Sequence, residues 1–309
     1  MESIVYKKAF LFPGQGSQFV GMGLDVYGKY PLAKNMYSIA NKVLGCRIDK
    51  ISFYDLENNL NRTLFTQPAI FVHSAILSTI LQKHKVIPNC VAGHSLGEIT
   101  ALFAANAISF EDALHLVKIR AKLMEECNYK NLGSMAVVLN ASKQELDNLC
   151  NQKGVIVKAN FNSDSQVILS GEDKCIEHAI NVGKKLKIKI KKLNVSGAFH
   201  SPLMNDAKIN ITSAIKSLNF NKPTIPIFQN LTGKCSMNLS EIKSNLINQI
   251  ENPVLWKNII RQMDKDNINY FYEIGPKNVL TNLTKRILHQ PKTISIQTIG
   301  DLVTECQIK

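Results

Sequence analysis

The alternation of short apolar runs with longer amphipathic stretches predicts an α/β fold. Four apolar runs have the length of buried strands, and they occupy residues 9–12, 90–92, 225–228 and 270–274. Helical periodicity lies between them, most clearly at residues 97–105 and 110–126. Because strands that alternate with helices favour parallel pairing, we expect a large domain with a short, mostly parallel sheet.

A different order of elements occupies residues 133–195. Four strand patterns and two helical patterns follow one another there, at residues 134–139 (strand), 142–150 (helix), 155–159 (strand), 166–169 (strand), 172–185 (helix) and 188–195 (strand). This order is typical of a ferredoxin-like unit. The sequence therefore predicts a large domain formed by residues 1–130 and 197–309, with a ferredoxin-like small subdomain, residues 131–196, inserted into it.

The sequence carries no pattern typical of a membrane-spanning or secreted protein. Its uninterrupted apolar runs are much shorter than the roughly 18 to 20 residues that cross a bilayer. The start, Met1-Glu2-Ser3, lacks the charged leader and apolar stretch of a signal peptide. The seven cysteines are widely spaced, with no CxxC pair and no metal-ligand spacing. We therefore expect a cytoplasmic protein with reduced cysteines, no metal site and no membrane partner.

The positive charge of the chain favours an acidic or phosphate-bearing partner over nucleic acid. The formal net charge is +13, yet only five of the 37 basic residues are arginines. Arginine forks are prominent in the recognition of bases and phosphates. We therefore expect no nucleic-acid partner, although compositional drift towards Lys, Asn and Ile explains the charge as well as a basic docking surface does.

Residues 93–97, Gly-His-Ser-Leu-Gly, match the GxSxG pattern of a nucleophile elbow. In that turn, glycines let a strand bend sharply into a helix and present the serine hydroxyl above the edge of the sheet. The apolar run 90–92 and the helical stretch 97–105 supply this context. Ser95 is therefore the candidate nucleophile of an α/β-hydrolase-like large domain, and an ordinary strand-to-helix turn is the alternative.

His200 is the candidate base, which a serine hydroxyl needs within hydrogen-bond reach near neutral pH. It lies in the turn-like segment 197–204, where the small subdomain ends and the large domain resumes. A lone histidine is more often structural, so that alternative stays open. No acidic residue suggests itself as a third member, but a backbone or amide carbonyl can hold the imidazole tautomer, and a Ser95–His200 dyad is chemically sufficient.

The glycine-containing loop at residues 12–18 predicts an oxyanion site. Phe19 stands where a dinucleotide loop has its third glycine, and no GK[ST] follows, so we expect no cofactor. A flexible loop at the carboxyl end of a strand can instead point amide N–H groups at a developing oxyanion, with Gln15 and Leu96 as donors. A structural turn is the alternative.

Arg120 lies on the apolar face of the helix predicted at residues 110–126. Its neighbours on that face are Ala113, Leu116, Val117, Leu123 and Met124. A buried guanidinium needs a protein carboxylate or an anionic ligand that it binds through two N–H groups. Spacing alone favours the internal salt bridge over the ligand.

Together these segments resemble the malonyl-coenzyme A:acyl carrier protein transacylase family, which supplies malonyl units to fatty-acid synthesis. The resemblance spans about residues 6–300, and its motifs follow the family's order. They are GQGSQ at 14–18, TQPAI at 66–70, GHSLGE at 93–98, Arg120, GAFHSPL at 197–203, QIENPVLW at 249–256 and EIGP at 273–276. This likeness implies that Ser95 carries the malonyl group, that His200 activates Ser95, and that Gln249 orients His200 through a carbonyl. It also assigns Arg120 to the malonate carboxylate, against the salt bridge that spacing favours.

The resemblance further implies how the acyl group is surrounded and transferred. Gln15 and the N–H of Leu96 are assigned to the oxyanion hole, and Phe199 and Met124 to substrate binding. A bulky aromatic residue before the histidine accompanies a preference for malonyl over methylmalonyl groups in related polyketide acyltransferases. The implied partners are malonyl-CoA and acyl carrier protein, used in a ping-pong reaction by an enzyme that we expect to be monomeric.

Three alternatives remain open from the residues. The odd-numbered lysines of the basic run, Lys187, Lys189 and Lys191, would line one strand face that could meet an acidic carrier protein, or would merely guard a solvent-exposed strand. A serine acyl-hydrolase would share Ser95 and His200 but release free acid. A non-enzymatic scaffold for carrier proteins would need neither residue.

Overall fold

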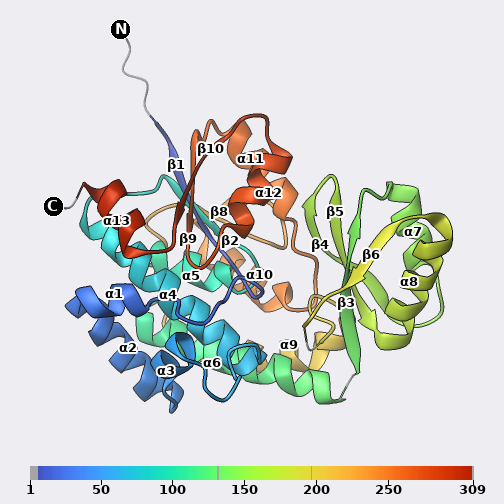
Figure 1. Cartoon of the computed structure of the whole chain (residues 1–309), viewed down its shortest axis with the longest axis horizontal. Helices are drawn as coiled ribbons and strands as arrows, with labels where there is room; N and C mark the ends of the chain where they lie inside the picture. The colour runs from blue at the N-terminus through green and yellow to red at the C-terminus, as the bar shows by residue number, and fades with distance from the viewer. Residues whose placement is uncertain (1–5, 131, 196, 308–309) are drawn as a thin grey trace, which may run out of the picture.

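The strands of the protein form two separate sheets. The structure, a computed structural model, describes residues 6–130, 132–195 and 197–307. A six-stranded sheet with helices on both faces forms the larger part, and a four-stranded sheet with two helices stands beside it (Figure 1). The mixed α/β architecture that the apolar pattern predicts is confirmed.

The six-stranded sheet has the order β10-β9-β1-β2-β7-β8, and only the pairing of β7 with β8 is antiparallel. Its strands are β1 (Lys8–Phe12), β2 (Cys90–Gly93), β7 (Ile227–Phe228), β8 (Cys235–Ser236), β9 (Tyr270–Ile274) and β10 (Lys292–Ile296). The four predicted strands correspond to β1, β2, β7 and β9. The apolar run in β1 is continuous because both faces of the sheet are buried: Phe10 and Phe12 join one core cluster, and Ala9 and Leu11 join the other.

The helices of the larger part lie on both faces of this sheet. They are α1 (Leu24–Lys29), α2 (Pro31–Leu44), α3 (Ile48–Phe53), α4 (Thr63–Lys83), α5 (Gly97–Ala104), α6 (Phe110–Lys130), α9 (Asn205–Ser217), α10 (Leu239–Gln249), α11 (Trp256–Lys265), α12 (Val279–Ile287) and α13 (Ile299–Cys306), with a 3-10 turn η1 (Pro202–Met204) before α9. Residues of α4 and α6 belong to the core cluster of Phe10, and residues of α11 and α12 to that of Leu11.

Helix α4 is a core helix. Among the described residues it is the one helix that is long and apolar enough to cross a membrane by length and composition alone. However, 83% of its most apolar 18-residue window is buried inside the protein. It packs against α5 and α6, and its buried residue Gln67 lines the pocket described below.

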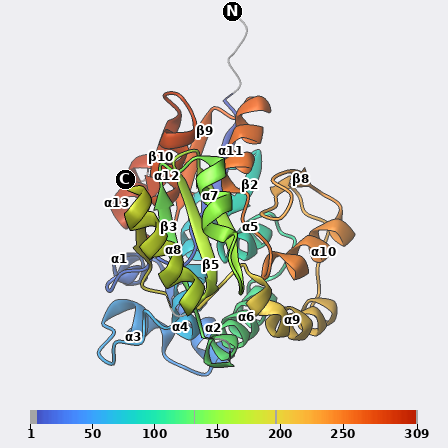
Figure 2. The same ribbon diagram turned by 90° about the vertical axis from the view of Figure 1, so that its right-hand side faces the viewer.

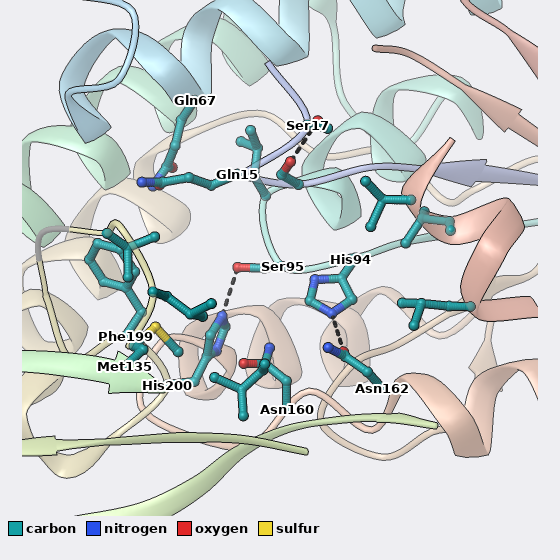
Figure 3. Close-up of a pocket in the computed structure, with 18 of the residues that line it drawn as sticks. Gln15, Ser17, Gln67, His94, Ser95, Met135, Asn160, Asn162, Phe199 and His200 are labelled. Atoms are coloured by element: carbon teal, nitrogen blue, oxygen red, sulfur yellow. Dashed lines mark hydrogen bonds between the residues drawn. The ribbon is translucent and has the colours of Figure 1, made fainter. Parts of the chain in front are cut away.

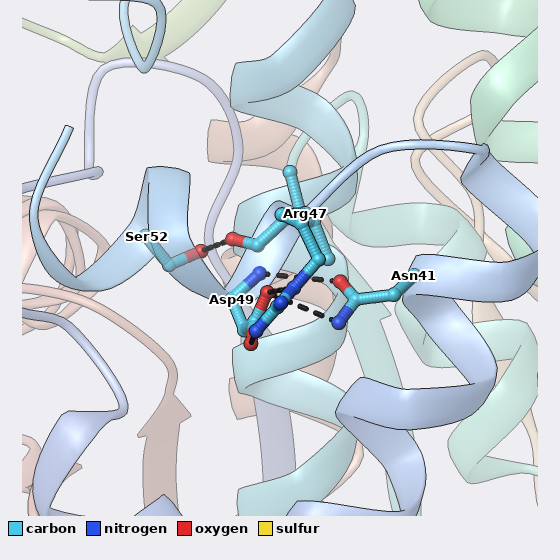
Figure 4. A network of polar contacts seen from close by, with 5 residues as sticks. Asn41, Arg47, Asp49 and Ser52 are labelled. Carbon is cyan, nitrogen blue, oxygen red and sulfur yellow. Dashed lines mark hydrogen bonds and ion pairs between the residues drawn. The ribbon is translucent and has the colours of Figure 1, made fainter. Parts of the chain in front are cut away.

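The loop between α2 and α3 is fixed by a local polar network (Figure 4). The carboxylate of Asp49, which is 3% exposed, accepts hydrogen bonds from Arg47 at 2.9 and 2.7 Å and from the Asn41 amide at 3.0 Å. These contacts satisfy a buried charge on the outer side of the helical layer, so they serve the fold.

The smaller sheet is antiparallel, with the order β4-β5-β3-β6. Its elements follow the predicted order and are β3 (Gly133–Leu139), α7 (Lys143–Cys150), β4 (Ile156–Ser163), β5 (Gln166–Glu172), α8 (Asp173–Leu186) and β6 (Lys189–Lys192). Helix α7 starts at a capping box formed by Ser142 and Glu145. Strand β4 runs on to Ser163, beyond the predicted end, because Asn160, Phe161 and Ser163 continue its pairing with β5. Strand β6 ends at Lys192, before the predicted end, and lies at the edge of the sheet.

The smaller sheet lies against the larger part (Figure 2), and main-chain and ionic contacts tie the two together. Val254 donates to the carbonyl of Ala159 at 2.8 Å, and its own carbonyl accepts the N–H of Phe161 at 2.9 Å. At the turn after β4, Asp164 pairs with Lys257 and Arg261 of α11 at 3.1 and 2.6 Å. These contacts hold β4 against α11, so residues from both sheets can line one pocket.

Candidate active site

Ser95 occupies a sharp turn between β2 and α5, as the GxSxG pattern predicts. Its φ of 53° is in the left-handed region. The flanking glycines are required by close packing, because a Cβ on Gly93 would lie 1.8 Å from the carbonyl carbon of Gly97, and a Cβ on Gly97 would lie 2.0 Å from the carbonyl oxygen of Phe12. The sequence context of a nucleophile elbow is therefore confirmed.

Asn230, just after β7, holds this strained turn in place. Its Oδ1 accepts the main-chain N–H of Ser95 at 2.7 Å, and its Nδ2 donates to the carbonyl of Gly93 at 2.6 Å. The side chain is fully buried. It satisfies two main-chain groups that the bend removes from the sheet. No local pattern in the sequence marks Asn230, since it lies 135 residues from the serine that it supports.

His200 lies within hydrogen-bond reach of the Ser95 hydroxyl, with 2.7 Å between Nε2 and Oγ (Figure 3). Its Nδ1 faces two main-chain oxygens, that of Gln249 at 2.9 Å and that of Asn252 at 3.1 Å. Because carbonyls only accept, Nδ1 carries the proton and Nε2 is free to accept one from Ser95. The contact with the Gln249 carbonyl is the one expected from sequence, and Asn252 is an addition.

The environment of His200 keeps its imidazole neutral. Burial lowers its pKa to about 3, with a further decrease from the positive charge of Arg120. The uncharged ring is the form that can accept a proton. The arrangement can therefore act as a base towards Ser95 without a third, acidic member.

Arg120 reaches the same point from α6. Its guanidinium is 2% exposed, and it donates to Gln67 Oε1 at 2.8 Å, to Ser95 Oγ at 3.1 Å and to Gln249 Oε1 at 3.0 Å. Burial lowers its pKa to about 10, so it remains a cation at neutral pH. None of the described carboxylates forms a salt bridge with it. The salt bridge favoured by spacing alone is therefore wrong, and a buried cation faces the pocket beside the serine.

Two main-chain amides near Ser95 have no acceptor in the described part of the chain. Among the described residues, neither the N–H of Gln15 nor that of Leu96 donates a hydrogen bond, and both residues line the pocket. Strands β1 and β2 are adjacent, with Phe12 in register with Gly93, so the two loops leave the sheet side by side. Unpaired amides in this position can stabilise an oxyanion. The Gln15 side chain does not take part, because its Nε2 donates to Thr63 at 3.1 Å.

The pocket has a volume of about 180 Å³ and is lined from both sheets. Its apolar wall includes both predicted residues, Met124 and Phe199, and residues of the smaller sheet and its return segment, namely Met135, Ile168, Leu193 and Val195. The smaller sheet also supplies Asn162, whose Oδ1 lies 2.9 Å from Nε2 of His94 in the elbow (Figure 3). The sequence does not predict this contact, because Asn162 belongs to a separate element, β4, that carries no motif of its own.

The residues predicted from sequence therefore converge on one cleft. Ser95 contacts both His200 and Arg120. Gln249 contacts Arg120 through its side chain and His200 through its main-chain carbonyl. Gln67 and Glu98 also contact this group, through Arg120 and Gln249 respectively, and both belong to motifs of the sequence, TQPAI and GHSLGE. All seven cysteines are free, and no group of three or more His, Cys, Asp or Glu in the described part is arranged to hold a metal ion.

Comparison with known proteins agrees with this site. Residues 9–305 match the sequence model of the acyl transferase domain family. The malonyl CoA-acyl carrier protein transacylase of Escherichia coli O157:H7 is 36% identical over 285 residues, which cover 91% of this chain and 92% of that protein.

Solved structures of malonyl transacylases are also similar to this protein. The malonyl CoA-acyl carrier protein transacylase of Coxiella burnetii has a TM-score of 0.93 at 30% identity and covers 98% of this chain and 97% of its own. A malonyl-transacylase solved in complex with a type II polyketide acyl-carrier protein has a TM-score of 0.93 at 32% identity, covering 98% of this chain and 100% of its own. The chain therefore belongs to the acyl transferase family and, within it, to the malonyl CoA-acyl carrier protein transacylases.

Proposed function

We propose that this protein transfers a malonyl group from malonyl-CoA to the phosphopantetheine thiol of acyl carrier protein and thereby supplies fatty-acid elongation. The observation that carries the proposal is the buried Arg120, which lies 3.1 Å from the Ser95 hydroxyl and has no carboxylate partner among the described residues. A guanidinium in this position fits the free carboxylate of a malonyl group attached to Ser95. The names of the relatives support the same substrate pair.

The first half-reaction loads Ser95. The serine oxygen attacks the thioester carbonyl of malonyl-CoA while its proton passes to Nε2 of His200. The negative charge that develops on the carbonyl oxygen is stabilised by the N–H groups of Gln15 and Leu96. The carbon–sulfur bond then breaks, and the departing thiolate takes the proton from His200, which leaves malonyl-Ser95 and coenzyme A.

The second half-reaction transfers the malonyl group to the carrier. His200 accepts the proton of the phosphopantetheine thiol, and the sulfur attacks the ester carbonyl. The bond between the carbonyl carbon and the Ser95 oxygen breaks, and the serine oxygen recovers its proton. The two transfers give a ping-pong mechanism in which Ser95, His200 and the two main-chain amides supply the nucleophile, the proton transfers and the oxyanion stabilisation, so we propose that no cofactor takes part.

The pocket wall supports a preference for a small carboxylated acyl group. Phe199 is 6% exposed and Met124 is 1% exposed, so both are fixed by packing. Their bulk beside the serine leaves little space for a branch on the carbon next to the thioester. We therefore also propose that the protein prefers malonyl groups to methylmalonyl groups.

We also propose the finer assignments that accompany this function. The large domain comprises residues 1–130 and 197–309 and is α/β-hydrolase-like, as the elbow between β2 and α5 suggests. The small subdomain, residues 131–196, is ferredoxin-like, and its sheet order β4-β5-β3-β6 supports this. The protein would act as a cytoplasmic monomer.

The decisive experiment is to measure the intact mass of the protein after mixing with malonyl-CoA. We expect a gain equal to one malonyl group, its absence in a Ser95→Ala variant, and its loss again when acyl carrier protein bearing phosphopantetheine is added. Release of free malonate in place of malonyl carrier would identify an acyl-hydrolase. No adduct at all would favour a scaffold and contradict the proposal.

A further inference from the structure

Glu98, in the first turn of α5, places a buried carboxylate behind the active site. Its side chain is 1% exposed. Oε2 accepts a hydrogen bond from Nε2 of Gln249 at 2.8 Å and one from the main-chain N–H of Asn230 at 3.2 Å. None of the described cations forms a salt bridge with it. Burying a carboxylate among neutral donors costs folding free energy. We therefore expect Glu98 to have a role beside the reacting groups.

The side-chain amide of Gln249 lies between Glu98 and Arg120. Its Nε2 donates to Glu98 and to the main-chain oxygen of Ser95, the latter at 2.9 Å. Its Oε1 accepts from Arg120 at 3.0 Å. A carboxylate only accepts and a guanidinium only donates, so one orientation of the amide satisfies both partners. The reversed orientation would set donor against donor and acceptor against acceptor.

This arrangement separates two opposite charges by one amide. A direct ion pair between Glu98 and Arg120 would occupy the N–H groups that an anionic ligand needs. With Gln249 in between, the carboxylate offsets the positive charge of Arg120 at a distance, and the guanidinium stays available. The carboxylate of Glu98 also accepts hydrogen bonds from Asn230, which holds the elbow, and from Gln249, whose main-chain carbonyl orients His200.

We propose that Glu98 is a positioning residue, which through Gln249 and Asn230 holds the serine, the histidine and the arginine in their reactive arrangement while offsetting the arginine's charge. The inference rests on the proposed function. The charged group that faces Glu98 is Arg120 of α6, and the other groups packed against it, Gln249, Asn230 and Gln229, are neutral amides.

The test compares Glu98→Gln with a matched control, Glu125→Gln. Glu125 is also a buried carboxylate, 9% exposed, but it pairs with Arg62 at 3.4 Å and does not line the pocket. In Glu98→Gln we expect kcat to fall about tenfold to a hundredfold for both malonyl transfer and acetyl-thioester hydrolysis, because the dyad serves both. KM for malonyl-CoA should not rise, since Arg120 remains and loses its offsetting charge. The control should keep wild-type kcat.

The pH profile adds a readout that a merely structural role would not change. Burial raises the pKa of Glu98 to about 7, whereas His200 stays neutral far below that pH. The wild-type kcat should therefore decrease as pH falls through about 7 and Glu98 gains a proton, and this decrease should be absent in Glu98→Gln. The wild-type profile alone remains decisive if the variant does not fold.

Three outcomes would overturn the inference: an unchanged kcat in Glu98→Gln, a KM effect without a kcat effect, or a flat wild-type profile around pH 7. Failure of the proposed function is distinguishable, because wild-type protein would then show no malonyl transfer. Acetyl-thioester hydrolysis, which needs only Ser95 and His200, would still report on Glu98 in that case.

Discussion

The two sheets contribute to the pocket in different ways. The parallel sheet supplies loops at the carboxyl ends of its strands: Gln15 follows β1, Ser95 follows β2 and Asn230 follows β7, whereas His200 reaches Ser95 from the segment between β6 and η1. The antiparallel sheet supplies wall residues such as Met135 and Ile168, and the side-chain amides of Asn160, Asn162 and Gln166. Parallel strands bring loops from distant parts of the chain to one edge, whereas an antiparallel sheet presents a face. The turn that carries Ser95 thus depends on the parallel sheet, and the shape of the pocket depends on both sheets.

The largest effect should come from removing the cation on the side of the larger sheet. Arg120→Ala should lower malonyl transfer at least about a hundredfold, because the substrate carboxylate would lose a buried, charge-assisted partner that contributes about 3 kcal/mol or more. Hydrolysis of acetyl esters should stay the same or rise, since acetyl has no carboxylate. Steady-state rates with both thioesters measure this, and an unchanged preference for malonyl would refute the role of Arg120.

The next largest effect should come from removing Asn230, which holds the turn of Ser95 in place. Asn230→Ala would leave the N–H of Ser95 and the carbonyl of Gly93 buried without partners, which should reduce the free energy of unfolding by about 2 kcal/mol or more. Acyl loading of Ser95 should slow about tenfold, because the strained turn would relax. Denaturant unfolding and loading followed by mass spectrometry provide the measurements. Asn210→Ala, at an exposed position on α9, is the control that should change neither.

Sequence predicted elements and local motifs well, and long-range contacts poorly. The GxSxG elbow is encoded in five adjacent residues, and it formed as expected. The partners of the elbow, Asn230 and Asn162, lie 135 and 68 residues from the residues they contact, and no local pattern marks them. Helical periodicity correctly placed Arg120 in the interior but could not show what faces it, so the salt bridge favoured by spacing was wrong.

The short elements were missed for a similar reason. Strand β8 has two residues and pairs only with β7, so its existence depends on a neighbour and not on its own pattern. Strand β10 is half-buried at the edge of the sheet and lacks the continuous apolar run of β1. The ends of β4 and β6 differ from prediction because pairing with β5 lengthens the first and an edge position shortens the second.

A smaller effect should follow from breaking the contact between the two sheets at the elbow. Asn162→Ala removes the partner of His94 Nε2, but His94 also packs against Trp256 with 5.5 Å between ring centroids, so the turn should persist. We expect a threefold to fivefold decrease in kcat for transfer with little change in stability. Asn181→Ala, exposed on α8, is the control. A loss as large as that of Asn230→Ala would mean that the smaller sheet takes part in the chemistry.

The smallest effect should come from reversing charges at the edge of the smaller sheet, and it should change only the reaction with the carrier protein. Lys187, Lys189 and Lys191 are exposed at and before the edge strand β6, and none of them forms a salt bridge with a described residue, whereas Lys192 pairs with Asp173 at 3.1 Å. If this edge meets an acidic carrier protein, Lys187→Glu combined with Lys189→Glu should raise KM for the carrier about twofold to fivefold, most at low salt, and leave loading from malonyl-CoA unchanged. The same reversal at Lys216 and Lys222, which are exposed at the end of α9 and just beyond it, controls for net charge. Equal effects of the two double variants would mean that these lysines do not bind the carrier and only protect an exposed strand edge from pairing.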